Sequence, residues 1–68
     1  MKVFAKRLKE LRKENNLSQN QMAKTLGITQ QSYARYEADT SEPCFEMLVE
    51  ISNYFEVSCD YLLGKSDY

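Results

Sequence analysis

Residues 17–37 read LSQNQMAKTLGITQQSYARYE and contain the start and stop signals of two short helices. Ser18 is a favoured helix N-cap residue, and Gln21, three positions later, completes the pattern of a capping box. Gly27 stands where the C-terminus of a helix needs a left-handed backbone. These signals predict a helix over about residues 19–26.

A second helix is expected very soon after that glycine. Thr29 can cap it, and it extends over about residues 30–38 with Tyr33 and Tyr36 on its inward side. Two helices of about eight residues joined by a glycine turn cannot lie flat along each other, so they cross steeply. This geometry is that of a helix-turn-helix, which we place at about residues 19–38.

Three further helices are expected, over about residues 3–15 and 45–55 and in a short segment that Ser58 caps and Gly64 ends. In each, apolar residues recur at the spacing of a helix face that packs on a core. These apolar residues are Phe4, Leu8, Leu11, Phe45, Leu48, Ile51, Phe55, Tyr61, Leu62 and Leu63. The sequence therefore predicts an all-α fold of five short helices.

Length and hydropathy restrict the class of protein. A chain of 68 residues forms one domain, and we expect no separate domain for a small-molecule effector. No apolar run approaches the roughly 18 residues of a membrane span. The first apolar stretch, residues 3–5, ends at Lys6, too early for a secretory signal. We expect a soluble cytoplasmic protein without a membrane partner.

Catalytic and metal-binding chemistry has few candidate residues. The chain has no histidine, and its two cysteines, Cys44 and Cys59, are not in a Cys-x-x-Cys spacing, so neither a zinc site nor a Cys-His nucleophile is expected. In the cytoplasm both cysteines should remain thiols. We expect no enzyme, no metal and no cofactor.

Charge is divided between the two halves of the chain, although its net value is only −1. Residues 1–36 hold eight Lys or Arg against two Glu, a balance of +6, whereas residues 37–68 hold one Lys against eight acids, a balance of −7. A segregated basic region can attract phosphate while the acidic region repels it. A basic helix face that is merely solvated is the alternative interpretation.

Residues 17–32 (LSQNQMAKTLGITQQS) and the following Arg35, Tyr36 and Glu37 resemble the Cro/C1-type, or Xre, family of helix-turn-helix regulators. The likeness extends to RLKELR at residues 7–12 and VSCDYLLG at residues 57–64. The helix start TQQS is similar to that of the phage 434 repressor. The resemblance implies a lambda-repressor-like fold and sequence-specific binding of double-stranded operator DNA by a transcriptional regulator, in the repressor class.

Base readout is expected from the exposed face of the second helix of the motif, which in this geometry enters the major groove. Gln30 and Gln31 lie on its first turn and Arg35 one turn further. Glutamine can bond bidentately to adenine and arginine to guanine. Ser32 is small enough to touch a base or to let the helix approach. The alternative is a set of ordinary exposed polar residues.

Phosphate contacts are expected beside the groove. By resemblance Gln19 is the leading candidate, with Ser18 and Thr29 at the N-termini of the two helices, where free N–H groups attract anions. Lysines of the first helix are further candidates that can equally be solvated: Lys6, Lys9 and Lys13. The resemblance also implies that Arg12 and Glu37 form a structural ion pair that fixes the recognition helix.

Two features depart from the family pattern. The loop at residues 38–43 contains Asp39 and Glu42 and no base, so it should repel the DNA backbone that basic loops of phage members contact. Tyr33 stands where an aliphatic residue is usual. Because an unpaired buried hydroxyl is costly, the Tyr33 hydroxyl must reach water, a partner group or phosphate. We expect a core tyrosine with an exposed tip, in preference to a direct DNA contact.

One helix-turn-helix reads few base pairs, so we expect a homodimer on an inverted repeat. By resemblance the C-terminal helix with Cys59 and Tyr61 could hold the dimer, although core packing or solvent exposure is the simpler account of both residues. The alternative function is a protein-interaction module, such as an antitoxin or anti-repressor, that uses the acidic C-terminal half. That alternative leaves the exposed pair Gln30 and Gln31 beside Arg35 unexplained.

Overall fold

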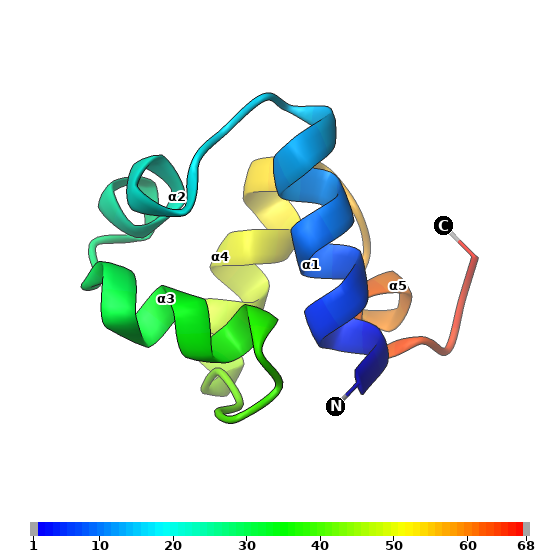
Figure 1. The fold of residues 1–68 in the computed structure, drawn as a ribbon. Helices are drawn as coiled ribbons and strands as arrows, with labels where there is room; N and C mark the ends of the chain where they lie inside the picture. The colour runs from blue at the N-terminus through cyan, green and yellow to red at the C-terminus, as the bar shows by residue number, and fades with distance from the viewer. Residues whose placement is uncertain (1, 68) are drawn as a thin grey trace.

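The computed structural model describes residues 2–67, which form five α-helices and contain no strand (Figure 1). The helices are α1 (Lys2–Glu14), α2 (Gln19–Leu26), α3 (Gln30–Glu37), α4 (Phe45–Phe55) and α5 (Cys59–Leu63). The predicted all-α class with five helices is confirmed. Two boundaries differ by one residue: α1 lies one residue earlier than expected, and α3 ends at Glu37, with Ala38 as its C-cap.

Local capping explains where α2 and α3 begin and end. The Ser18 hydroxyl accepts a hydrogen bond from the Gln21 backbone at 3.1 Å, and the Ser18 N–H donates to the Gln21 side chain at 2.8 Å, which completes the capping box. Gly27 ends α2 with φ +72°, a conformation that an L side chain resists. Thr29 then caps α3 by accepting from the Ser32 backbone at 3.1 Å.

Each of the five helices packs one face into a shared hydrophobic core. Its buried residues are Phe4, Leu8, Leu11, Met22, Ala23, Leu26, Tyr33, Leu48, Ile51 and Leu62. In Figure 1, α1 stands between α3 and α5, while α2 lies beside α3 and packs on α4. The helix-turn-helix formed by α2 and α3 therefore occupies one side of the molecule, and α5 occupies the other.

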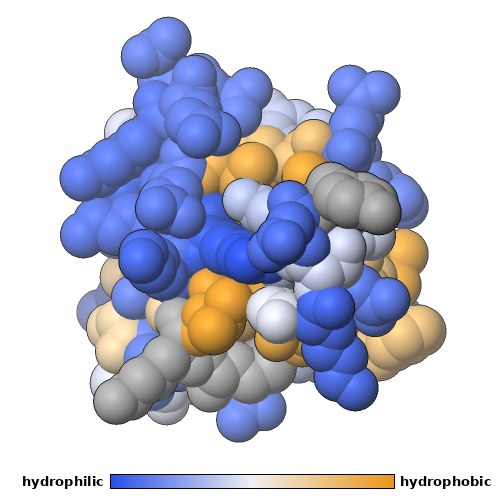
Figure 2. All heavy atoms as spheres, turned by 90° about the vertical axis from the view of Figure 1, so that its right-hand side faces the viewer, coloured by the Kyte–Doolittle hydropathy of each residue, from blue (hydrophilic) through white to orange (hydrophobic). Residues whose placement is uncertain are grey.

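The side that carries α5 is mainly hydrophilic, with apolar surface in small separate areas (Figure 2). Some apolar residues that follow the helix periodicity are nevertheless exposed, most of all Phe45 at the start of α4, with 76% of its surface accessible. None of the helices within residues 2–67 is long and apolar enough to span a bilayer.

Candidate nucleic-acid interface

The outward face of α3 carries the residues expected to read bases. Gln30, Gln31 and Arg35 are exposed, and Ser32 is half-buried. The Thr29 hydroxyl donates to the Ser32 hydroxyl oxygen at 3.0 Å while it accepts from the Ser32 backbone, so this side chain is held against the cap of the helix. The longer side chains of Gln30, Gln31 and Arg35 point away from the core and can reach into a DNA groove.

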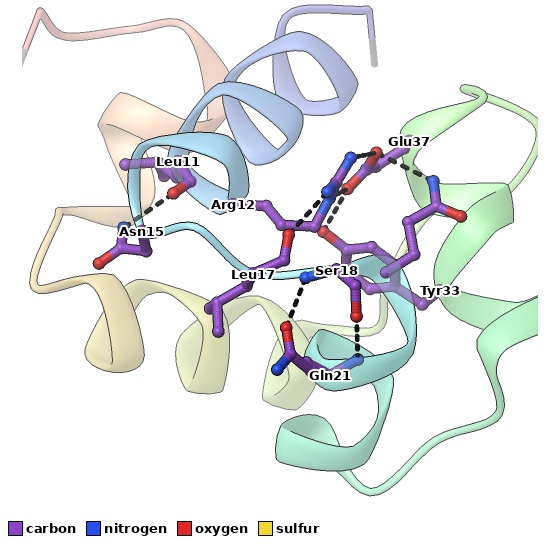
Figure 3. Close-up of polar contacts among 9 residues, drawn as sticks. Leu11, Arg12, Asn15, Leu17, Ser18, Gln21, Tyr33 and Glu37 are labelled. Carbon is purple, nitrogen blue, oxygen red and sulfur yellow. Dashed lines mark hydrogen bonds and ion pairs between the residues drawn. The ribbon is translucent and has the colours of Figure 1, made fainter.

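The carboxylate of Glu37, in the last turn of α3, lies at the centre of a buried polar cluster (Figure 3). Arg12 of α1 donates from Nε to Oε2 at 2.7 Å and from Nη2 to Oε1 at 3.1 Å. Gln19 of α2 donates from Nε2 to Oε1 at 3.1 Å, and the Tyr33 hydroxyl donates to Oε2. We call these four residues the Glu37 cluster. It joins α1, α2 and α3 through one carboxylate.

The cluster also fixes the segment that leads into α2. Arg12 donates from Nη1 to the carbonyl oxygen of Leu17 at 2.8 Å, so one guanidinium holds both the entry to α2 and the end of α3 (Figure 3). The side chains of Arg12 and Glu37 are only 12% and 4% exposed. The structure therefore brings Arg12 and Glu37 together in a position where they can orient the recognition helix.

Protonation states follow from these contacts. Burial acts to raise the pKa of Glu37, but hydrogen bonds from Arg12, Tyr33 and Gln19 and the charge of Arg12 outweigh it and lower the pKa below its ordinary value. The hydrogen bond to Glu37 raises the pKa of Arg12. Burial, followed by the hydrogen bond to Glu37, raises the pKa of the Tyr33 hydroxyl. The cluster is thus an ion pair with a neutral tyrosine.

The expectation of an exposed tip for Tyr33 is wrong. The whole side chain is buried, and its hydroxyl obtains a partner inside the protein, the carboxylate one helical turn away. The ring packs edge-on against Tyr36, with centroids 6.4 Å apart. Because Glu37 accepts the hydrogen bond that the Tyr33 hydroxyl donates, Tyr33 can be buried without the penalty of an unpaired hydroxyl.

The residues expected to bind phosphate lie in different settings. Ser18 is exposed and Gln19 half-buried at the start of α2, and Thr29 is exposed at the start of α3. Lys9 and Lys13 are exposed on α1, as is Lys6 in the same helix. Gln19 differs from the others because its amide already donates to Glu37.

The loop after α3 contains an acidic residue, Asp39, in a left-handed backbone conformation. Asp39 has φ +61°, in the left-handed region, and both Asp39 and Glu42 are exposed. Thr40 closes the turn by donating from its backbone N–H to the carbonyl oxygen of Arg35 at 3.0 Å. This turn holds the acidic loop directly after the recognition helix.

Cys59 and Tyr61 of α5, which the resemblance links to a dimer, are half-buried and pack against the core. The guanidinium of Arg7 lies 4.2 Å from the centroid of the Tyr61 ring and donates to the carbonyl oxygens of Tyr61 and of Ser66, the latter at 2.6 Å. Both residues thus pack on the core within one chain, and a role for them in a dimer stays a prediction.

Sequence reasoning missed two contacts of Glu37. The bond from Tyr33 joins residues four apart in a helix, a spacing that could have indicated it. The bond from Gln19 joins residues eighteen apart and has no local signal.

Within residues 2–67, no three Cys, Asp or Glu side chains gather in a way that could hold a metal ion.

A helix-turn-helix family model matches residues 8–62. The uncharacterized HTH-type transcriptional regulator YqaE of Bacillus subtilis is 46% identical over 66 residues, which are 96% of this chain and 57% of that protein. A second regulator of that bacterium, YobD, is 38% identical over 65 residues, which are 96% of this chain and 58% of YobD.

The cryptic phage CTXphi transcriptional repressor RstR of Vibrio cholerae is 42% identical over 59 residues, which are 87% of this chain and 53% of RstR. The chain spans little more than half the length of each of these relatives. Since the family model covers most of its length and its helices form the motif in the expected place, the chain belongs to the helix-turn-helix family of the Cro/C1, or Xre, type.

Proposed function

We propose that this protein is a transcriptional regulator, acting as a repressor, that binds a specific double-stranded DNA operator with α3 in the major groove. The observation that carries the proposal is the exposed set Gln30, Gln31 and Arg35 on a helix whose far end is held by the buried Glu37 cluster. Side chains that can bond bidentately to base edges, on a helix that is held in place, are what direct readout requires.

Base contacts are assigned to Gln30, Gln31, Ser32 and Arg35. Phosphate contacts are assigned to the helix starts and to the exposed lysines of α1: Ser18, Gln19, Thr29, Lys9 and Lys13. The basic balance of residues 1–36 supports this assignment, since it concentrates positive charge in the segments that form α1 to α3.

A homodimer on an inverted repeat completes the proposal. One recognition helix contacts only a few base pairs, and two copies related by a two-fold axis would read half-sites about one DNA turn, or roughly 34–36 Å, apart. A cytoplasmic location belongs to the same proposal, because that is where a bacterial operator lies. The chain is proposed to act as one domain, residues 1–68, without an enzymatic activity.

The test is selection of bound sequences from a random duplex library near physiological salt, with Gln30→Ala and Arg35→Ala run in parallel. We expect an inverted repeat that loses definition at single, different positions in each variant, with a discrimination loss of about 1–3 kcal/mol for each bidentate contact. A folded wild-type protein that enriches no sequence would contradict the proposal. It would favour the protein-interaction module, for which the acidic balance of residues 37–68 is the supporting observation.

A further inference from the structure

Gln19 and Glu37 are the first and last residues of the helix-turn-helix, at the ends of α2 and α3 that lie opposite the turn. Gln19 is the first residue of α2 and Glu37 the last residue of α3. At the turn, the backbone through Gly27 holds the helices together. At the other end, the hydrogen bond from Gln19 Nε2 to Glu37 Oε1, 3.1 Å long, joins them. The motif is therefore closed at both ends.

We infer that Gln19 is a positioning residue, which sets the angle of α3 against α2 through Glu37 and thereby aims Gln30, Gln31 and Arg35 at the bases. This inference rests on the proposed function and gives Gln19 a role in addition to the phosphate contact assigned to it above. Its consequence is that Gln19 contributes to the choice of DNA sequence without touching a base.

The other donors to Glu37 do not duplicate this link. Tyr33 belongs to the same helix as Glu37, and Arg12 of α1 reaches only the Leu17 carbonyl oxygen, two residues before α2 begins. Gln19 is therefore the one donor to Glu37 that belongs to α2 itself. The acceptor is an ionised carboxylate with a side chain 4% exposed, and hydrogen bonds to charged groups are stronger than neutral ones. A single amide can therefore hold the end of α3 firmly.

A phosphate contact and a positioning contact affect DNA binding differently. Phosphate contacts carry no sequence information, so the loss of one weakens binding to every duplex about equally. Hydrogen bonds to base edges depend on direction, so a rotation of α3 weakens the operator complex more than the complex with random DNA. The ratio of the two affinities therefore separates the roles.

The experiment compares Gln19→Met, which keeps the length of the side chain and removes its donor, with the wild-type protein. Affinities are measured for the selected operator and for a scrambled duplex of the same composition. We expect the ratio of these affinities to fall about three- to tenfold, the range that one hydrogen bond supplies. Asn20→Ala, at an exposed amide in the same turn, is the matched control and should leave the ratio unchanged.

Gln19→Asn is a second variant, which keeps the amide but is one methylene too short to reach Glu37. It should also lower the ratio of the operator affinity to the scrambled-duplex affinity. A carbon-13 NMR titration of the Glu37 carboxyl in each free variant shows whether the donor is lost, because its pKa then rises. If both affinities fall by the same factor, or neither falls, while that pKa rises, the inference is overturned. A wild-type protein without preference for any duplex would instead refute the proposed function.

Discussion

The guanidinium of Arg12 meets the carboxylate of Glu37 side-on, through two N–H···O bonds of 2.7 and 3.1 Å that join the last turns of α1 and α3. Bidentate, charge-assisted hydrogen bonds of this kind are stronger and more directional than hydrogen bonds between neutral groups. Both side chains are largely withdrawn from water. Removing either partner is therefore expected to be costly, because it leaves an uncompensated buried charge.

Arg12→Met should destabilise the protein by about 3–5 kcal/mol, because it leaves the buried Glu37 carboxylate without its cation. Urea unfolding followed by circular dichroism measures the change. Lys13→Met, at the exposed neighbouring position, is the control and should change stability by about 0.5 kcal/mol or less. Equal stabilities of the two variants, together with an unchanged salt dependence of DNA binding for Arg12→Met, would show that the pair has no structural role.

Stability should fall in acid through the Glu37 cluster. The folded-state pKa of Glu37 lies below its ordinary value of 4.5, so its stabilising contribution is present above that pH and is lost as the pH falls towards the folded-state pKa. Comparing the free energies of unfolding of wild type and Glu37→Gln between about pH 7 and about pH 3 isolates this contribution from other carboxyls. The advantage of the wild type should shrink with falling pH; a constant difference would contradict the assignment.

Removing the two acids of the loop after α3 should strengthen DNA binding. Asp39→Asn with Glu42→Asn removes two negative charges that repel phosphate, and Asn tolerates the left-handed backbone at position 39. We expect an affinity gain of about three- to tenfold at low salt that diminishes as salt is added. Glu50→Gln with Asp67→Asn makes the same change in net charge at exposed positions elsewhere, and a similar gain there would mean that the loop lies away from the DNA.

The two glycines should differ in their sensitivity to substitution. Both have positive φ, +72° at Gly27 and +83° at Gly64, but an added Cβ meets nothing within 4 Å at Gly27 and lies 2.8 Å from Val3 Cγ1 at Gly64. Gly27→Ala should cost about 1–2 kcal/mol for the backbone alone. Gly64→Ala should cost more because of the added clash.

Val3→Ala in the Gly64→Ala background is the matched test, because it removes the clashing methyl groups and leaves the backbone strain. The double mutant should recover part of the excess cost over Gly27→Ala, as measured by thermal unfolding against Val3→Ala alone, since alanine keeps the Cβ that lies 3.1 Å from the added atom. If the two mutations instead add without coupling, the close approach of Gly64 to Val3 has no energetic weight.

The sequence predicted the five helices well because their signals are local. Ser18, Thr29 and Ser58 each cap a helix with their own hydroxyl, and Gly27 and Gly64 end helices with the left-handed backbone that glycine favours. None of these signals needs knowledge of the tertiary fold. The predicted boundaries therefore agree with the structure to about one residue.

The polar interior was harder to predict because its partners come from different helices. The burial of Tyr33 depends on how α3 packs on the remaining helices, and the Gln19 to Glu37 bond exists because α2 and α3 cross at a particular angle. A preference of residue types along the chain does not encode that angle. The assignments of bases and phosphates to individual side chains stay predictions until DNA binding is measured.

Arg7 fixes the course of the segment that follows α5. Its guanidinium donates to the backbone carbonyl oxygens of Tyr61 and Ser66, which ties the segment after α5 to α1. That segment lies on the side of the molecule away from α2 and α3 (Figure 1). A fluorescent dye or a surface tether attached at Asp67 would therefore lie on the side of the molecule away from α2 and α3. The same placement suits single-molecule work, in which the anchored protein must leave its reading face open to a passing duplex.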